Sequence, residues 1–534
     1  MNDFNQIENV GGGRKYSKPQ TKILPLTKEA TEYLTNVRKL DKATLEGYRL
    51  GCNKSGEIVI PYYDENDQLQ LIKFRHPIGK LLKRKRQNND GSFDEYEAKT
   101  VIEPGGKPIL LGSQLCLPSE GPLVICFGDY DAMTVAQDGV PNCVSLPFGD
   151  KGFDFIKEQW QFLESFSEII IYPDNDTFPN PDAELRAKKK LDELANRLGK
   201  YRVRIVNQSD RFSTKDANEL LQKKGVGFNR KAIENAEWYP SGIVAVADYI
   251  EEEMQEGTPI GIRPIDEATG GLSGGQLIIV SGDNGAGKTS NVLNWVANFV
   301  DQRIPVMIWS GEQKVGKIRY WFERVAAGPN NLKSHVSEKT GFTFWFPLEE
   351  FKDKIREWYR DYLYQYTEVN IDAEQFFASA ELAVRRFGCG LIVADNLMAF
   401  TGGEGDAYYQ AQGDFTESCK RFAEKWNIPF ILICHNKKED EGKKVLILPD
   451  KNSIEGSKKI QNWADIIFQM VRLPETRKVE FNNSDGILRL CKSRESGILE
   501  DVGLKYEPHS NRFCQKTEEG NIYRQFGWEK TVLF

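Results

Sequence analysis

Short apolar runs alternate with stretches of helical spacing between residues 122 and 207. The runs predict strands and the stretches between them predict helices, the first of which should begin at Asp131. The four runs are PLVICFG, NCVSLPFG, EIIIYPDND and YRVRIV. This alternation is typical of a small α/β domain with a mostly parallel sheet.

The same alternation resumes on a larger scale at Gly261. Its apolar runs are QLIIVSG, PVMIWSG, GLIVADN, FILICHN, ADIIFQMVR and ILRLCKSR. Near-continuous apolar strands joined by helices predict a doubly wound nucleotide-binding domain, so the fold class of the chain is α/β.

The rest of the chain predicts a β-rich part and a connector. Residues 57–77 predict a hairpin with its turn at Glu65, Asn66 and Asp67. Apolar residues with helical spacing at 243–254 predict a connector helix that packs on its own domain or on a neighbouring subunit. We therefore expect five segments: a flexible start (1–23), a β-rich subdomain (24–120), the small α/β domain (121–236), a linker helix (237–260) and the large α/β domain (261–534).

Composition narrows the class of protein. The chain has 534 residues, a formal net charge of −7, nine cysteines and four histidines. No stretch approaches the roughly 18 consecutive apolar residues of a membrane span, and the polar start lacks a secretory signal core, so we expect a soluble cytoplasmic protein without a membrane partner. The cysteines are scattered without a CxxC pair, which predicts that no structural zinc is bound.

Net charge does not decide whether nucleic acid is a partner, because local basic strips dominate such binding. One basic run follows the predicted hairpin and is either a solvated loop or a contact to a phosphate backbone. Its charged residues are Lys80, Lys83, Arg84, Lys85 and Arg86.

One motif predicts nucleoside triphosphate binding. Residues 282–289, GDNGAGKT, match the pattern GxxxxGK[ST] between a predicted strand and a predicted helix. In such a loop the backbone N–H groups cradle phosphates, Lys288 reaches the terminal phosphates, and the Thr289 hydroxyl holds Mg²⁺. The predicted nucleotide-binding residues are Gly282, Asp283, Asn284, Gly285, Ala286, Gly287, Lys288, Thr289 and Ser290.

Three further residues at strand ends are candidates for hydrolysis. Asp395 is expected to contact Mg²⁺, and Glu312 could activate the attacking water. His435 could sense the γ-phosphate. The alternatives are an ordinary strand-end aspartate, a surface glutamate and a buried, satisfied histidine.

The motifs of the large domain resemble, in order and spacing, those of hexameric replicative helicases of the DnaB type. The resemblance is carried by GDNGAGKTS, IWSGEQ, LIVADNLM, FILICHNKKEDEG, SIEGSKKIQNWADIIFQMVR and LRLCKSRESG. It is strongest to the phage primase-helicases and Twinkle, and it extends from Ile58 to about Tyr506. It implies a ring, most simply a hexamer, with ATP or another NTP or dNTP and Mg²⁺ between RecA-like domains.

The resemblance also implies 5′ to 3′ translocation on single-stranded and forked DNA. Replicative DNA polymerase and single-strand-binding protein are possible further partners, and a phage protein of this kind would act in the host cytoplasm. Arg494 matches the arginine finger given to the neighbouring subunit, with Lys492 as its implied assistant, and Gln461 matches the residue that relays nucleotide state. Two channel loops match those that grip DNA, although Glu455 replaces a family-typical arginine. Their implied phosphate contacts, otherwise solvated lysines, are Lys437, Lys438, Lys443, Lys444, Lys458 and Lys459.

The small α/β domain resembles a TOPRIM domain, the metal-binding module of primases and topoisomerases. Asp174 and Asp176 match its metal-binding pair, and Asp131 matches its loop aspartate. Lys215, Asp216 and Asn218 match primase-type members, and the hairpin with Lys73 and Arg75 resembles the subdomain that holds template and nucleotides.

The TOPRIM-like part departs from the family in two ways. The chain lacks the four-cysteine module of priming members, and Phe127 stands at the position of the catalytic acid. Asp129 would face the same side of an extended segment as Phe127 and could substitute for that acid.

Three functions follow from these observations. The first is a ring-forming helicase with a degenerate or altered TOPRIM domain. The second is a bifunctional protein that also makes RNA primers, using the TOPRIM residues. The third is a RecA-like or DnaB-like ATPase that acts in loading or recombination without processive unwinding.

Overall fold

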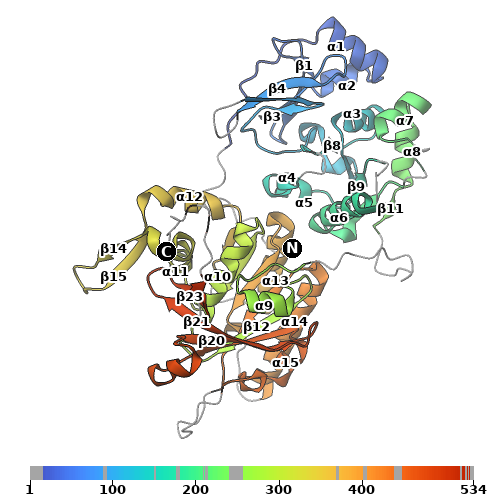
Figure 1. Ribbon diagram of the computed structural model, residues 1–534. Coiled ribbons are helices and arrows are strands. Elements are labelled where there is room, and N and C mark those ends of the chain that lie inside the picture. Colours follow the sequence, from blue (N-terminus) through green and yellow to red (C-terminus); the bar gives the residue numbers. More distant parts are fainter. Residues whose placement is uncertain are drawn as a thin grey trace. The chain divides into compact units, whose positions relative to one another are not determined.

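The protein divides into two compact units, Lys15–Ile250 and Glu251–Phe534, of which the second also includes Met1–Arg14. Figure 1 shows the helices and strands of both units in this computed structural model. Among the described residues, no helix is long and apolar enough to cross a membrane. The structure describes residues 16–87, 93–148, 152–175, 181–207, 210, 214–239, 256–368, 372–400, 406–437, 448–517, 520–522, 526 and 528.

The N-terminal unit begins with an antiparallel sheet in the order β1-β2-β3-β6. Strands β2 and β3 form the predicted hairpin, with Asp67 in the left-handed region of its turn at a φ of 63°. Apolar residues of the first helices share one buried core with this sheet. The elements are α1 (Lys28–Glu32), the π-helix η2 (Tyr33–Val37), α2 (Lys42–Gly47), β1 (Gly51–Cys52), β2 (Ile58–Tyr63), β3 (Leu69–Arg75) and β6 (Val101–Ile102).

The basic run is a strand rather than a loop. Strand β4 (Leu82–Gln87) pairs with β5 (Phe93–Ala98) in an antiparallel hairpin. Arg84 Nη2 lies 2.8 Å from Glu57 Oε2, and Lys83 and Lys85 lie 3.7 and 3.2 Å from carboxylates of β5. The ion pairs of Lys83 and Lys85 join β4 to β5, and that of Arg84 joins β4 to Glu57, so these three charges have partners within the unit.

The small α/β domain has the predicted, mostly parallel sheet in the order β11-β10-β9-β7-β8. Alternate residues of its central strands enter two different cores, because helices cover both faces. Its strands are β7 (Leu123–Cys126), β8 (Cys143–Ser145), β9 (Ile169–Tyr172), β10 (Val203–Ile205) and β11 (Glu237–Trp238). Its helices are α3 (Asp129–Gln137), α4 (Asp154–Glu158), α5 (Trp160–Glu164), α6 (Pro181–Leu198), α7 (Ala217–Lys224) and α8 (Phe228–Glu234).

Two boundaries differ from the sequence prediction. Helix α3 begins at Asp129 instead of Asp131, so both aspartates lie in its first turn. Glu237 and Trp238 form the antiparallel edge strand β11 and not the start of a linker. The predicted connector helix at 243–254 lies outside the described residues.

The C-terminal unit is built on a ten-stranded sheet in the order β16-β13-β17-β18-β12-β19-β20-β21-β22-β23. The strands from β16 to β19 are parallel, as predicted, and those from β20 onward are antiparallel. The strands are β12 (Leu277–Gly282), β13 (Val306–Ser310), β16 (Leu363–Tyr366), β17 (Leu391–Asp395), β18 (Phe430–Ile433), β19 (Ile466–Arg472), β20 (Gly486–Ser493), β21 (Glu500–Glu507), β22 (Arg512–Thr517) and β23 (Gly520–Ile522). The sequence did not predict β21–β23 or the separate hairpin of β14 (Leu332–Val336) and β15 (Thr343–Pro347).

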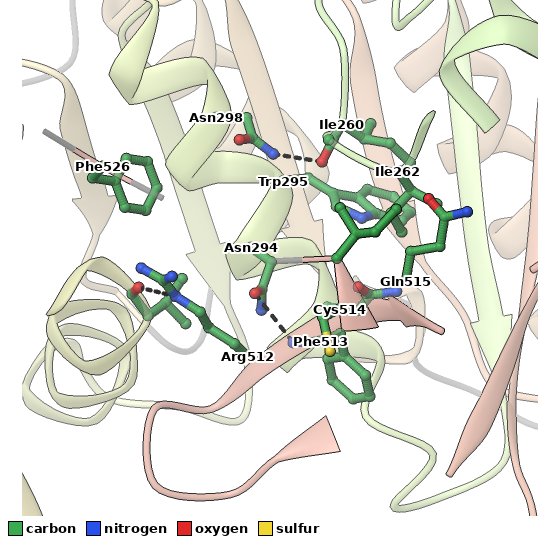
Figure 2. Close-up of a pocket in the computed structure, with 14 residues that line it drawn as sticks. Ile260, Ile262, Asn294, Trp295, Asn298, Arg512, Phe513, Cys514, Gln515 and Phe526 are labelled. Atoms are coloured by element: carbon green, nitrogen blue, oxygen red, sulfur yellow. Dashed lines mark hydrogen bonds between the residues drawn. The ribbon is translucent and has the colours of Figure 1, made fainter. Parts of the chain in front are cut away.

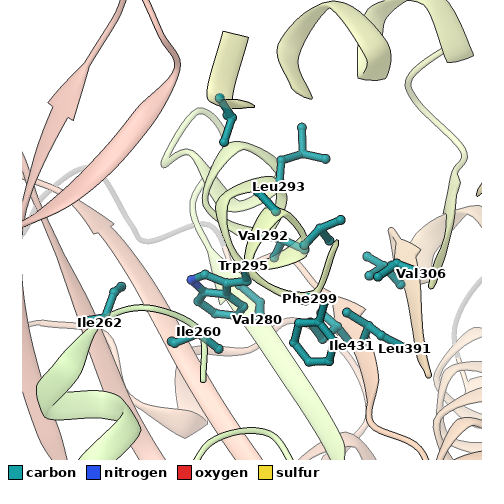
Figure 3. Packing of buried hydrophobic residues seen from close by; sticks show 14 of the residues in the cluster. Ile260, Ile262, Val280, Val292, Leu293, Trp295, Phe299, Val306, Leu391 and Ile431 are labelled. Carbon is teal, nitrogen blue, oxygen red and sulfur yellow. The ribbon is translucent and has the colours of Figure 1, made fainter. Parts of the chain in front are cut away.

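Helices cover both faces of this sheet. Strand β12 places Ile278 and Val280 in one core, together with Trp295 and Phe299 of α10, and Ile279 in the other. Figure 3 shows Val280, Trp295 and Phe299 in the first of these cores. Burial on both faces explains why Leu277–Val280 of β12 form a continuous apolar run. The helices are α9 (Arg263–Thr269), α10 (Lys288–Asp301), α11 (Val315–Ala327), α12 (Glu349–Tyr359), α13 (Ala373–Phe387), α14 (Asp406–Trp426) and α15 (Lys458–Trp463).

Candidate functional site

The predicted phosphate loop joins the end of β12 to the start of α10. Lys288 is the first residue of α10, and its Nζ donates to the carbonyls of Gly282 at 2.8 Å and Asp283 at 3.1 Å. Burial lowers the pKa of Lys288, although Asp395 and Glu312 oppose this change. The loop therefore holds a buried cation at a helix N-terminus, the arrangement that binds phosphates.

Gly287 must remain a glycine for this loop to form. Its φ is 92°, in the left-handed region, and a Cβ at this position would lie 2.7 Å from Cζ of Phe513 on β22. No residue pattern predicted that Phe513, in the antiparallel part of the sheet, lies beside the phosphate loop.

Asp395 ends β17 and meets the loop directly. Thr289 Oγ1 donates to Asp395 Oδ2 at 2.7 Å. Burial raises the pKa of Asp395 to about 6, against the hydrogen bond from Thr289. The two residues expected to share Mg²⁺ are thus in contact, and one hydroxyl with one carboxylate suits an ion that takes its other ligands from phosphates and water. Within the described parts of the chain, no group of three or more His, Cys, Asp or Glu is placed to hold a metal by itself.

Glu312 and His435 also reach this site, and Asn396 joins them. Asn396 Nδ2 lies 2.5 Å from Glu312 Oε1 and 2.9 Å from His435 Nε2. His435 Nδ1 lies 3.3 Å from Lys288 Nζ. Burial, and then the charge of Lys288, lowers the pKa of His435, so its ring is neutral at pH 7. Sequence reasoning missed Asn396, whose only signal is its place directly after Asp395.

The segment after His435 connects the site to one of the predicted channel loops. Asn436 accepts a hydrogen bond from Ser281 Oγ at 2.8 Å and pairs with Ile454 in an antiparallel bridge. Glu455 N donates to His435 O, and Lys437 N donates to Ser453 O, both at 2.9 Å. Residues 435–437 and 453–455 therefore form one paired element.

The predicted DNA-contacting lysines divide into described and undescribed ones. Lys437 and Lys458 are exposed, and Lys459 Nζ forms a surface ion pair with Asp414 Oδ1 at 3.1 Å. Lys438, Lys443 and Lys444 lie outside the described residues.

Arg494 and Lys492 lie at the amino ends of the parallel strands, whereas the phosphate loop lies at their carboxyl ends. Lys492 Nζ donates to the carbonyls of Gln461 at 2.8 Å and Ala464 at 2.6 Å. Arg494 follows β20, whose Ser493 pairs with Ile466 at the start of β19. Gln461 thus contacts Lys492 through its backbone, at the end of α15.

A pocket beside α10 is separate from this site. It is lined by one face of α10, by the segment Ile260–Ile262 and by β22, and neither Lys288 nor Asp395 contributes to it. Figure 2 shows Phe513 N donating to Asn294 Oδ1 and Asn298 Nδ2 donating to Ile260 O within it. These bonds fasten β22 and the 260–262 segment to the helix that carries Lys288.

In the N-terminal unit, three of the predicted TOPRIM residues, Asp131, Asp174 and Asp216, lie close together. Asp131 is buried and accepts a hydrogen bond from Asn218 N at 2.9 Å. Burial, followed by the charges of Asp216 and Asp174, raises the pKa of Asp131 well above its usual value. Lys215 N donates to Glu219 Oε2 at 2.5 Å, next to Asp216. Asp176 lies outside the described residues.

Asp129 does not join this acidic group. Its side chain is 1% exposed and lies 2.8 Å from Lys73 Nζ and 3.4 Å from Arg75 Nη2, and it also accepts hydrogen bonds from the Tyr62 and Ser145 hydroxyls. Burial alone would raise the pKa of Asp129, but Lys73 and Arg75 outweigh it and lower the pKa to about 2.

The expectation that Asp129 could replace the missing acid is therefore wrong. Because α3 begins at Asp129, this residue and Phe127 do not share one extended segment. Phe127 is half-buried against the core of the small α/β domain. Lys73 is buried with Asp129, so it does not offer its charge to a template.

The chain is similar in sequence to a helicase family model and to a phage protein. Residues 257–515 match the family model of the DnaB-like helicase C terminal domain. The chain is 24% identical over 491 residues to the DNA helicase/primase of Enterobacteria phage T3, covering 84% of this chain and 80% of that protein.

Two Arabidopsis thaliana proteins are similar over shorter stretches. The Twinkle homolog protein, chloroplastic/mitochondrial, is 26% identical over 306 residues, or 52% of this chain and 39% of that protein. The Primase homolog protein is 30% identical over 247 residues, or 42% of this chain and 65% of that protein. The chain thus spans most of the phage protein and less than two thirds of each plant protein.

Proposed function

We propose that the protein is an NTP-dependent replicative DNA helicase, because residues 257–515 match the family model of the DnaB-like helicase C terminal domain. It forms a ring, most simply a hexamer, and couples nucleotide hydrolysis to 5′ to 3′ movement on single-stranded DNA and to unwinding of a fork. Replicative DNA polymerase and single-strand-binding protein are its expected partners at that fork.

The observation that carries this proposal is the separation of Arg494 from its own phosphate loop. Lys288 follows the carboxyl end of β12, whereas Arg494 lies beside Asp465, whose carboxylate binds Leu277 N at the amino end of β12. The length of β12, at about 3.3 Å per residue, puts roughly 16 Å between these two ends. An arginine so placed can act only on a nucleotide held by another subunit, which makes hydrolysis depend on ring assembly.

The hydrolytic roles follow from the contacts at the carboxyl edge. Lys288 and the loop amides bind the phosphates, while Thr289 and Asp395 hold Mg²⁺, which supplies charge neutralisation at the phosphate oxygens when it is bound. Glu312 accepts the proton of the attacking water, and Asn396 fixes the Glu312 carboxylate. Neutral His435 lies close enough to Lys288 to respond to the terminal phosphate.

Lys437, Lys458 and Lys459 are proposed to contact the DNA backbone. The support is their place on the paired element formed by residues 435–437 and 453–455 and on α15, which begins directly after it. A strand bound by these lysines would be connected to His435 through the hydrogen bond from Glu455 N.

The N-terminal unit is proposed to lack primer synthesis. Phe127 can neither accept a proton nor bind a metal, and Asp129 is enclosed by Lys73 and Arg75. Burial, and then the charges of Asp216 and Asp174, raises the pKa of Asp131, and a divalent cation would relieve the repulsion from these two carboxylates. Primer synthesis remains the second candidate function, since one relative is named a DNA helicase/primase.

Strand displacement from a forked duplex with ATP and Mg²⁺ tests the proposal. The wild-type protein should displace the strand, whereas Lys288→Ala should lose both ATPase and unwinding. Rings that hydrolyse ATP but never displace a strand would instead support the loading or recombination ATPase. Incubation with ribonucleotides on single-stranded DNA should yield no primers, and robust primer synthesis would overturn the assignment of the N-terminal unit.

A further inference from the structure

One buried carboxylate, Asp465, organises the edge of the sheet that carries the proposed arginine finger. It lies between α15 and β19, and its side chain is 10% exposed. Asp465 Oδ1 lies 3.0 Å from Arg494 Nη1. Asp465 Oδ2 accepts from Leu277 N at 2.8 Å and from Lys420 Nζ at 2.7 Å. A single side chain thus joins the finger, the first residue of β12 and a buried lysine.

The guanidinium of Arg494 contacts two groups of its own subunit, the carboxylate of Asp465 and the carbonyl of Asn462. Arg494 N donates to Asp465 O at 2.9 Å, and Nη2 donates to Asn462 O at 2.8 Å. Half of the side chain, 51%, stays exposed. These bonds use only part of its fork of donors, so the remaining N–H groups can meet a phosphate that approaches from outside the subunit.

Lys420 is the buried partner of Asp465. Lys420 lies on α14, and its Nζ also donates to Gly275 O at 2.8 Å and lies 3.2 Å from Glu424 Oε1. Buried charges are tolerated when they are paired and hydrogen-bonded, and two partners of Asp465 belong to regular elements, Leu277 N to β12 and Lys420 to α14. The carboxylate that meets Arg494 is therefore attached to a strand and to a helix.

We propose that Asp465 is the positioning residue for Arg494. It removes rotamer freedom from a long side chain before the neighbouring nucleotide arrives, so that the guanidinium is already oriented when the two subunits meet. Asp465 itself touches no substrate. The inference rests on the proposed function, in which Arg494 acts on the nucleotide of another subunit.

The competing explanation is that Asp465 only stabilises its own subunit. Its bond to Leu277 N fixes the start of β12, which leads to the phosphate loop, so losing it could disturb the subunit's own nucleotide site. The two explanations differ in which subunit's nucleotide is affected, and mixed rings separate them.

The test uses Asp465→Asn in the full-length protein. Removing the charge should lower kcat for ATP roughly 10- to 100-fold, with KM and fluorescent-nucleotide binding near wild type. The reason is that Arg494 loses its charge-assisted contact with Asp465 and is no longer oriented toward the neighbour's nucleotide. Arg494→Ala should lose about 1,000-fold or more. Each variant is then mixed with an equal amount of Lys288→Ala, which cannot bind nucleotide productively but carries an intact finger.

In mixed rings a Lys288→Ala subunit can supply its finger to the phosphate loop of an Asp465→Asn subunit. ATPase activity should therefore rise well above the sum of the two separate preparations, which a misfolded Asp465→Asn subunit could not produce. If the single variant fails to fold, the double variant Asp465→Asn with Lys420→Met removes both buried charges together and takes its place in the mixture.

Two results would overturn the inference while leaving the proposed function standing. One is wild-type turnover by Asp465→Asn. The other is a slow Asp465→Asn that Lys288→Ala does not restore, although Arg494→Ala is restored in the same experiment. If neither variant is restored by Lys288→Ala, Arg494 does not act between subunits, and the proposed function fails together with the inference.

Discussion

Replacing Asp129 by asparagine should destabilise the N-terminal unit strongly, although Asp129 stands in the segment that resembles a catalytic loop. Lys73 is 6% exposed and would lose its only carboxylate among the described residues. Breaking a buried ion pair by removing one partner typically costs about 3–5 kcal/mol. We expect a loss of this size in the free energy of unfolding.

The pH dependence of stability gives a second value for the contribution of the Asp129 carboxylate to the free energy of unfolding. The pKa of Asp129 falls from its ordinary value of 3.8 to about 2 in the folded protein, and this difference is worth about 2.5 kcal/mol at roughly 1.36 kcal/mol per pH unit. Because the folded pKa is the lower one, this stabilisation is fully present above pH 4 to 5. It is lost as the pH falls toward 2, and Asp129→Asn should remove it at every pH.

Urea or thermal unfolding of the full-length chain, with hydrogen exchange to report on the N-terminal unit alone, measures both effects. Asp129→Asn combined with Lys73→Met should regain much of the loss, since no unpaired lysine remains. Asp131→Asn is the matched control: burial and two neighbouring aspartates already raise the pKa of Asp131, so its neutralisation should be neutral or stabilising. Equal stabilities for Asp129→Asn and the wild type at pH 7 would refute the ion-pair account.

Three other substitutions probe the two units. Phe127→Glu should produce labelled ribonucleotide primers on single-stranded DNA, where the parent makes none. The free energy of unfolding should fall by roughly 1–3 kcal/mol, because a half-buried ring is lost from the core. Equal primer yields from the two proteins would contradict our assignment of Phe127. Asn396→Ala should lower kcat for ATP about 10- to 100-fold without changing nucleotide affinity, because Asn396 fixes the Glu312 carboxylate and the His435 ring. Steady-state kinetics and a binding titration measure the two quantities, and an unchanged kcat would show that this role of Asn396 is wrong. Gly287→Ala should abolish fluorescent-nucleotide binding, and adding Phe513→Ala should not restore it because the left-handed φ of 92° remains; restored binding would show that only the ring contact matters.

The parts of the structure that could be predicted are those determined by nearby residues. Strands β12, β17 and β18 are buried on both faces, so each reads as a continuous apolar run wherever its neighbours lie. The phosphate loop is equally local, because its geometry comes from glycines and a helix start within a few residues of Lys288.

What could not be predicted depends on partners far away in the sequence. Asp129 looked like a free acid because the residues that enclose it, Tyr62, Lys73 and Arg75, precede it by 54 to 67 positions and come from another sheet. Asn396 gave no signal because its role depends on Glu312, at the end of a different strand. Residue type and spacing report what a side chain can do, but only the tertiary structure decides which partner it meets.

The contacts of residues 453–465 argue that nucleotide sensing, DNA contact and the arginine finger share one structural element. At one end, Glu455 N binds the carbonyl of His435; at the other, the carbonyls of Gln461 and Asn462 bind Lys492 and Arg494. Helix α15 lies between these ends and is too short to be stable alone, so its position is determined by both sets of contacts. Helix α15 also carries two of the proposed DNA-contacting lysines, so a DNA strand bound to it would contact the same element that is hydrogen-bonded to His435 and to Arg494. Three separate loops would not provide this connection, and for this reason mixed rings are a sharper test of the site than any single-residue replacement in a uniform ring.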